Sequence, residues 1–314
     1  FYHHARTFTH FMTEEKFNVV ILDVADFKLI NGTYGTKKGN EVLVYLSNAF
    51  RYYVKNGLLT RYEGDQLLGL FHSKVKMDVE RINRNINKIA EEAPIPNIRI
   101  KVGIYEDVDT NLSIPIICDR ALMAEKSISK DFKTNVAFYT DELNQKQLAQ
   151  RQMENDFKSA IANREFKVYY QPKYDVNTEN IVGAEALVRW QKLDGTLISP
   201  GAFIPLFESD GLVVHLDEYV FESVCQFQKE RMENKLEIVP ISVNLSRASI
   251  HFSDVVERYV DIVNQKQIPF ECVPIELTES ATLYSEKILE ITDQLVNAGF
   301  TLHMDDFGSG YSSL

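Results

Sequence analysis

Acidic and amide side chains stand where buried strands are expected to end in the second half of the chain. Glu185 interrupts the apolar run Gly-Ala-Glu-Ala-Leu-Val, and Asn244 ends Ile-Ser-Val-Asn. The same pattern continues in Glu276, Glu279, Asp305 and Asp306. A carboxylate in a buried strand is costly unless it is paired or bound to a metal. One such acid could be a paired core residue, but several strands that each deliver an oxygen to one rim favour a site for hard divalent cations.

The adjacent pair Asp305 and Asp306 adds to this interpretation. Neighbouring carboxylates can serve two ions ~3.5–4 Å apart, an arrangement that clamps the attacking and leaving oxygens of a phosphodiester. Asp306 also begins an Asp-Phe-Gly triplet of the kind found in protein kinases. No His-Arg-Asp loop or Val-Ala-Ile-Lys strand precedes it, so the kinase alternative is rejected.

The elements that must position these residues alternate between strand and helix. Ser199 before Pro200 fits a helix start, and Gly299 after an apolar stripe fits a helix stop. Strands are predicted at 166–171, 182–188, 238–245, 273–277 and 301–304. This alternation predicts a parallel sheet of the (β/α)-barrel kind, with about five of the eight strands that closure needs. An open barrel exposes an apolar edge, so we expect the protein to continue beyond Leu314.

The first 140 residues predict a small mixed α/β domain. Strands are expected at 18–23, 58–62, 67–71, 98–104 and 136–139, with helices at 41–54, 79–92 and 114–126. Residues 140–163 are polar and lack Gly and Pro, which is typical of a connecting helix. We therefore divide the chain into a first domain (1–140), a connecting helix (141–163) and an incomplete second domain (164–314).

Composition limits the function classes. The chain has 314 residues, 45% apolar residues and a formal net charge of −11, which argues against a basic nucleic-acid-binding surface. The three cysteines are far apart and are expected to be buried small hydrophobes in a reducing, cytoplasmic setting. No apolar run is long enough to span a bilayer. Because the chain begins without an initiator Met, we expect it to be a piece of a longer protein, which leaves room for a sensor or a membrane anchor outside this sequence.

The second half of the chain resembles the EAL family of cyclic-di-GMP phosphodiesterases. The matching motifs occur in order: Gln171-Pro172, Glu185-Ala186-Leu187-Val188-Arg189-Trp190, Ser242-Val243-Asn244-Leu245-Ser246, Glu276-Leu277-Thr278-Glu279 and Asp305-Asp306-Phe307-Gly308. The resemblance implies metal ligands at Glu185, Asn244, Glu276, Asp305 and Asp306. It also implies substrate contacts from Gln171, Leu187 and Arg189. By the same resemblance Glu279 orders the loop after Asp306, which the family uses for catalysis and often for dimerisation.

The implied reaction is metal-dependent hydrolysis of cyclic di-GMP to linear pGpG. Mg²⁺ or Mn²⁺ would be the cofactor, and Glu185, Asp305, Asp306 and Glu279 would be the catalytic residues. The family pattern carries a catalytic Lys and a Glu beyond Leu314, so the segment taken alone is expected to be inactive.

The first domain resembles the GGDEF family of diguanylate cyclases, whose fold is a ferredoxin-like palm. The stretch from Asp23 to Gly35 and the turn around Asp65 carry the match. The signature is altered: Glu63, Gln66 and Leu67 replace its Gly, Glu and Phe, and Asn40 stands where the family has an Asp. Asp23, Asn31 and Asp65 remain as a vestigial site. We expect an inactive cyclase domain with a regulatory role, which folds and only docks or transmits; the alternative is regulatory GTP binding.

Two functions compete. The first is an enzyme that hydrolyses cyclic di-GMP, and the second is a receptor that binds cyclic di-GMP and signals without hydrolysis. The retained carboxylates favour the enzyme, because a receptor needs few of them.

Overall fold

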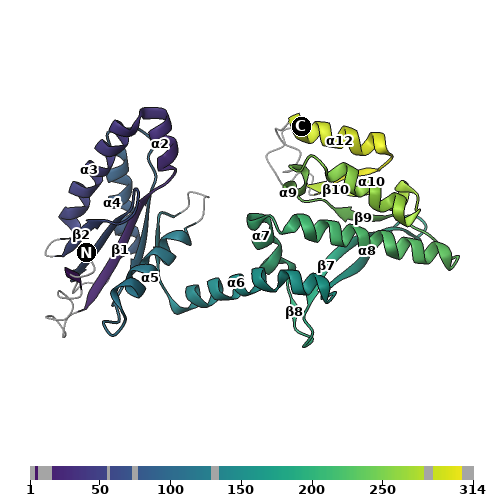
Figure 1. Cartoon of the computed structure of the whole chain (residues 1–314), viewed down its shortest axis with the longest axis horizontal. Coiled ribbons are helices and arrows are strands. Elements are labelled where there is room, and N and C mark those ends of the chain that lie inside the picture. The colour runs from purple at the N-terminus through teal and green to yellow at the C-terminus, as the bar shows by residue number, and fades with distance from the viewer. Residues whose placement is uncertain are drawn as a thin grey trace. The chain divides into compact units, whose positions relative to one another are not determined.

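The computed structural model describes residues 4–5, 16–54, 57–72, 77–128, 134–278 and 286–305, and all of their side chains except those of Thr278, Glu286 and Asp305. The chain forms two compact units, Phe1–Leu148 and Ala149–Leu314. Figure 1 shows each unit as a sheet covered by helices.

The first unit is built on a five-stranded sheet of order β2-β3-β1-β4-β5. Its strands are β1 (Phe17–Val24), β2 (Leu58–Arg61), β3 (Leu67–His72), β4 (Ile100–Tyr105) and β5 (Val136–Phe138). Its helices are α2 (Phe27–Tyr34), α3 (Thr36–Tyr53), α4 (Val79–Glu91) and α5 (Ile114–Lys126). The hairpin expected around Gly64 is present, since β2 and β3 pair antiparallel. Among the described elements of this unit, α2 and the first turn of α3 were not predicted.

Alternation along β1 divides the core of this unit between the two faces of the sheet. Val20, Leu22 and Val24 pack with α3 and α4, whereas Val19 and Ile21 pack with α5. A strand whose successive residues are all buried must be covered on both faces. The first unit is therefore a three-layer domain with β1 at its centre.

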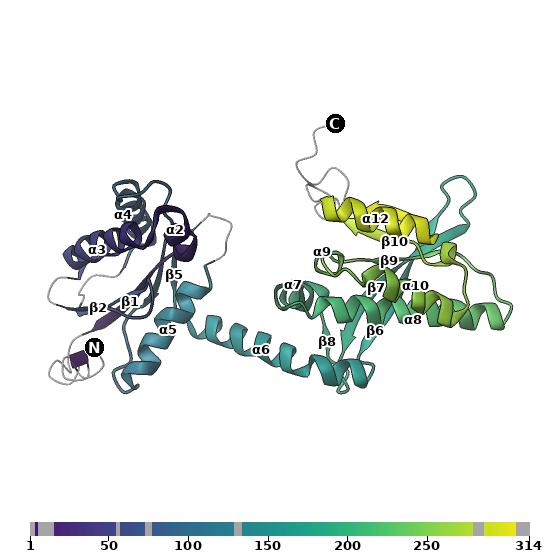
Figure 2. The ribbon, with the colours of Figure 1, turned by 45° about the horizontal axis from the view of Figure 1, so that its top comes forward.

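The second unit contains a six-stranded sheet of order β11-β10-β9-β7-β6, with β8 paired to β7. The strands are β6 (Phe166–Tyr174), β7 (Ile181–Gln191), β8 (Leu197–Ile198), β9 (Ile241–Asn244), β10 (Ile275–Thr278) and β11 (Leu302–Asp305). The helices are α6 (Asp141–Ala162), which begins in the first unit, α7 (Pro200–Asp210), α8 (Val213–Glu233), α9 (Arg247–Ile250), α10 (Val255–Lys266), the 3₁₀ helix η1 (Phe270–Cys272) and α12 (Glu286–Ala298). In Figure 2 α8, α10 and α12 lie along the same side of this sheet.

One feature of the second sheet differs from the prediction. The strands β7, β9, β10 and β11 are parallel as expected, but β6 runs antiparallel to β7. Residues 175–180 join these two strands through a turn in which the Asp175 carboxylate accepts hydrogen bonds from Asn177 and Thr178. A connection this short has no room for the crossover that a parallel pair requires.

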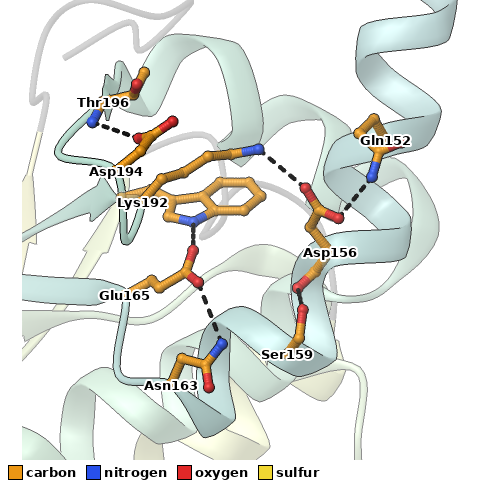
Figure 3. Close-up of polar contacts among 9 residues, drawn as sticks. Gln152, Asp156, Ser159, Asn163, Glu165, Lys192, Asp194 and Thr196 are labelled. Atoms are coloured by element: carbon orange, nitrogen blue, oxygen red, sulfur yellow. Dashed lines mark hydrogen bonds and ion pairs between the residues drawn. The ribbon is translucent and has the colours of Figure 1, made fainter.

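The C-terminal end of α6 is fixed to β7 by polar contacts, which Figure 3 shows. Lys192 donates to Asp156 (Nζ–Oδ2 3.0 Å), and Trp190 donates to Glu165 (Nε1–Oε2 3.0 Å). Trp190 is fully buried among the aromatic rings of Phe166, Phe203 and Phe207. These contacts hold the C-terminal end of β7, the strand that carries Glu185 and Arg189.

No helix within the described ranges is both long and apolar enough to cross a lipid bilayer. Cys118, Cys225 and Cys272 are buried and unpaired with one another, as expected for small hydrophobes. Burial raises the pKa of Cys118 and of Cys225 to about 12, so both remain thiols at neutral pH.

Candidate functional site

The strand register of the second sheet brings the predicted site residues onto one face. Glu185 lies opposite Gln171 on β6 and opposite Ser242 on β9. Glu276 on β10 lies opposite both Asn244 and His303. Residues paired in register point to the same side of a sheet, and alternate residues share a side. This face therefore gathers polar side chains from five neighbouring strands.

Glu185 and Asn244 are in direct contact. The Asn244 amide donates from Nδ2 to Oε1 of Glu185 at 3.0 Å. That bond leaves the amide oxygen of Asn244 as an acceptor for another partner. Both residues are half-buried, so they can be reached from the face that they share.

Glu276 is the most buried acid of the group, with an exposed fraction of 5%. Its Oε1 lies 2.5 Å from Lys173 Nζ and 3.5 Å from His303 Nδ1, whereas its Oε2 is buried with no hydrogen-bond partner. Burial raises the pKa of the Glu276 carboxyl, but hydrogen bonding by Lys173 and Ser242 outweighs burial, and the net pKa is lowered. Glu276 is therefore an ionised acid that carries an unused oxygen.

These properties fit a divalent cation in the second domain. Carboxylate and amide oxygens are the ligands that Mg²⁺ and Mn²⁺ prefer, and an unpartnered buried carboxylate oxygen is normally expensive. Asp305 ends β11 in register with Thr278, one strand beyond Glu276. Within the described ranges no three His, Cys, Asp or Glu side chains form a ready cation site. Glu279 and Asp306, which were predicted to act here, lie outside the described residues.

A cavity of about 620 Å³ adjoins this face. Its wall includes the predicted substrate-contacting residues Leu187 and Arg189, together with Asn244 and Arg247. Gln171 is exposed on β6 and does not line it. The volume of the cavity is within the range of ordinary ligand pockets. Its two arginines provide the bidentate donors that suit phosphate oxygens.

Asp217 of α8 supports the part of the cavity wall that is formed by the residues after β9. Its Oδ2 accepts a hydrogen bond from the backbone N–H of Ser246 at 3.0 Å and one from the Ser249 hydroxyl at 2.7 Å. Burial raises the pKa of Asp217 to about 6, although these bonds favour the ionised form. The short loop between Asn244 and Arg247 is thereby tied to α8.

The vestigial site of the first domain has a different character. Asp23 lies at the end of β1, and Asp65 lies in the turn between β2 and β3. The Asn31 side chain lies against the backbone of Gly39, where an added Cβ would come within 2.1 Å of its Oδ1. Lys101 contacts Asp23 and Glu125, with Nζ–O distances of 3.9 and 3.0 Å. The Lys101 ammonium group thus already supplies a positive charge beside Asp23 and Glu125. The residues of this site therefore do not fit a divalent metal.

Sequence reasoning missed several polar residues of both sites. Lys173 and His303 each stand two positions from a predicted residue on the same strand, so the period of two would have placed them on the same face. Asp217 and Arg247 come from the helices α8 and α9 and follow no strand pattern. The pair formed by Lys101 and Glu125 is separated by 24 positions and gives no local signal.

Comparison with known families defines the class of the chain. The EAL domain model matches residues 154–314, and the model of the diguanylate cyclase GGDEF domain matches residues 4–128. The chain belongs to the EAL family and carries a GGDEF domain in tandem with its EAL domain. The predicted fold, a GGDEF palm followed by a partial EAL barrel, is confirmed.

Particular relatives share this organisation. The bifunctional diguanylate cyclase/cyclic di-GMP phosphodiesterase MucR of Pseudomonas aeruginosa is 27% identical over 312 residues, covering 96% of this chain and 45% of MucR. The cyclic di-GMP phosphodiesterase PdeR of Escherichia coli is 27% identical over 306 residues, covering 95% of this chain and 46% of PdeR. The chain thus spans less than half the length of these relatives.

A solved structure supports the fold alone. The S helix-GGDEF-EAL structure of Vibrio cholerae LapD, bound to c-di-GMP, matches with a TM-score of 0.57 and 17% identity. The match covers 100% of this chain and 76% of the LapD chain.

Proposed function

We propose that the protein containing this chain hydrolyses cyclic di-GMP to linear pGpG at its EAL domain, with Mg²⁺ or Mn²⁺ as the cofactor. The observation that carries the proposal is the convergence of Glu185, Asn244 and Glu276 on one face of the sheet, with one Glu276 oxygen buried and unpartnered. The names of the relatives MucR and PdeR support the same activity.

The chain's own residues divide the work between holding ions and holding substrate. Glu185, Asn244 and Glu276 would hold one cation with Asp305, and Asp305 and Asp306 would hold a second. Bound ions would lower the pKa of the attacking water and neutralise charge on the phosphodiester oxygens. The hydrogen bond from Asn244 keeps the Glu185 carboxylate turned toward the shared face.

The cavity supplies the substrate contacts. Arg189 and Arg247 would bind phosphate oxygens, because a guanidinium presents paired donors in a fixed plane. Leu187, Pro200 and Ile204 offer apolar surface for a guanine base. Gln171 and Glu279 complete the proposed set, with Glu279 ordering the loop that follows Asp306.

We assign a regulatory role to the first domain (1–140) and a connecting role to residues 141–163, with the EAL domain at 164–314. Loss of cyclase activity is supported by Glu63 at a position where the family has Gly, since a carboxylate there repels a triphosphate. GTP binding in the first domain and homodimerisation through the EAL domain stay proposals. The three unpaired cysteines suit a cytoplasmic location.

The test is turnover of cyclic di-GMP by the full-length protein with Mg²⁺ or Mn²⁺. Glu276→Gln and Glu185→Ala should each reduce pGpG production by about 100-fold or more, because each removes a charged ligand oxygen. Glu271→Gln is the matched control, since Glu271 is exposed and lies five residues before Glu276. Full turnover in Glu276→Gln would contradict the proposed site.

A non-catalytic receptor is the second candidate, and Lys173 is the observation that favours it. Its ammonium group already neutralises Glu276, as a metal would. It reaches Glu276 from β6, on the face that β6 shares with β7, β9 and β10. If the protein is an enzyme, Lys173→Met should lower the Mn²⁺ concentration needed for half-maximal turnover, because a competing cation is removed. Tight cyclic di-GMP binding without hydrolysis, in wild type and variant alike, would establish the receptor.

A further inference from the structure

The GGDEF domain contains a buried ion cluster at the place where its family would hold a metal. Asp23 and Lys101 lie directly opposite each other in the β1–β4 ladder. The ammonium group of Lys101 is 3.9 Å from Oδ2 of Asp23 and 3.0 Å from Oε1 of Glu125 on α5. The side chain of Lys101 therefore bridges a surviving candidate ligand of the vestigial site and an acid from a helix.

Burial makes this bridge obligatory for Glu125. The exposed fractions of the Glu125, Asp23 and Lys101 side chains are 3%, 17% and 22%. Burial raises the pKa of Glu125, and the negative charge of Asp23 adds to that effect, while Lys101 acts against both. A carboxylate this deep remains acceptable only with a partner of opposite charge.

The backbone fixes where Glu125 stands. At Gly103 of β4, an added Cβ would lie 2.1 Å from the carbonyl oxygen of Ala121 and 2.3 Å from the backbone nitrogen of Glu125. Helix α5 therefore approaches β4 as closely as a strand without a side chain allows. The backbone of Glu125 is therefore held against β4, two residues along the strand from Lys101.

Asp65 contributes further negative charge. Burial raises the pKa of Asp65, and repulsion by Asp23 raises it further. The two surviving acids of the vestigial site therefore depend on a nearby positive charge. For Asp23 that charge comes from Lys101, which also contacts Glu125, and for Asp65 it comes from Arg61.

We infer that Lys101 is a built-in counter-ion that takes the place of the divalent metal in the GGDEF domain. Held between Asp23 and Glu125, its ammonium group repels a second cation from the Asp23 carboxylate. The GGDEF domain consequently folds and acts in regulation without Mg²⁺ or Mn²⁺. This inference is independent of whether the EAL domain hydrolyses cyclic di-GMP.

The test is local detection of Mn²⁺ in the full-length protein by methyl NMR. Ile21 lies two residues before Asp23 on the same face of β1, and Ala121 lies one turn before Glu125. Mn²⁺ should leave their methyl signals sharp in the wild type. In Lys101→Met the signals should broaden, and the unfolding midpoint of this domain should rise with added Mn²⁺, because Asp23 and Glu125 then lack the ammonium group that neutralises them.

Two controls separate charge from damage. Lys101→Arg keeps the positive charge, so the methyl signals of Ile21 and Ala121 should stay sharp when Mn²⁺ is added. Lys16→Met removes an exposed ion pair with Asp107, and in this variant the same methyl signals should also stay sharp. If Lys101→Met does not fold, Lys101→Ser combined with Glu125→Ala removes both members of the pair and should admit Mn²⁺ between Asp23 and Asp65.

Either of two results would overturn the inference. The first is Mn²⁺ broadening in the wild type that disappears in Asp23→Asn. The second is sharp signals in every folded Lys101 variant at saturating Mn²⁺, because another feature would then exclude the metal.

Discussion

Asp217 is the single residue that most directly links the cavity to pH. Its carboxylate holds the loop after Asn244 through Ser246 and Ser249, yet burial raises its pKa from 3.8 to about 6. Glu208 faces the same cavity and adds negative charge, and the buried Tyr259 lies close to Asp217. The folded protein therefore binds a proton at Asp217 more tightly than the unfolded chain does.

The sign of the pH effect follows from linkage. A raised carboxyl pKa contributes stability that is complete below pH 3.8 and is lost as the pH rises through about 6. In Asp217→Asn this loss is absent, while the Asn oxygen can still accept from Ser246 and Ser249. Between pH 4 and pH 7 the stability of Asp217→Asn relative to wild type should increase by about 2–3 kcal/mol. Urea unfolding followed by Trp190 fluorescence measures the difference.

Asp261→Asn provides the matched comparison, because Asp261 is an exposed acid in the same domain. Its difference from wild type should stay nearly constant over this pH range. A flat difference for Asp217→Asn as well would show that Asp217 does not titrate near pH 6.

At the level of elements, the close contact between α5 and β4 allows the packing of the GGDEF domain to be tested directly. Gly103→Ala would place a Cβ against two backbone atoms that cannot rotate away. Overpacking of this kind typically costs 1–3 kcal/mol, and a backbone obstacle favours the upper end, about 3 kcal/mol. Urea unfolding followed by far-UV circular dichroism should show a lower midpoint for this domain.

Gly69→Ala in β3 of the same sheet is the control. Its added Cβ would meet only side-chain atoms of Val54 and Phe50, at 3.2 Å and beyond. Side chains can adjust where backbone cannot, so the loss should be smaller. Equal losses in the two variants would mean that helix α5 can shift away from β4.

The elements also show what the sequence could and could not predict. Apolar runs located every long strand of the described residues, and α5 was predicted at its observed bounds, Ile114–Lys126. Helix α2 was missed because Asn31 and Gly32 lie within it and are poor helix formers. The direction of β6 was missed because periodicity reports which face a residue takes and carries no information on strand direction.

The candidate site was predictable only in part, for a related reason. Glu185, Asn244 and Glu276 stand out because a polar residue inside an apolar run is conspicuous. Lys173 was overlooked because a lysine near a strand end is usually solvated, and its contact with Glu276 spans 103 positions. Such partners are selected by sheet register, which only the three-dimensional structure reveals.

At the scale of the whole molecule, the described core residues fall into separate clusters for the two units. Leu46 is fully buried in the first unit, and Leu295 is fully buried in the second. Trp190, the only tryptophan in the sequence, belongs to the core of the second unit. Its fluorescence therefore reports on the EAL domain, whereas far-UV circular dichroism reports on both domains.

Separate cores predict separate unfolding transitions. In the whole chain Leu46→Ala should destabilise the first unit by about 3 kcal/mol, through lost burial and a residual cavity, and should leave the Trp190 transition unchanged. Leu295→Ala should shift the Trp190 transition by a similar amount. If Leu46→Ala moves the fluorescence and dichroism transitions together, the two units fold as one cooperative body. The proposed regulation by the GGDEF domain would then act through stability, whereas with independent transitions it would act through contacts in the folded state.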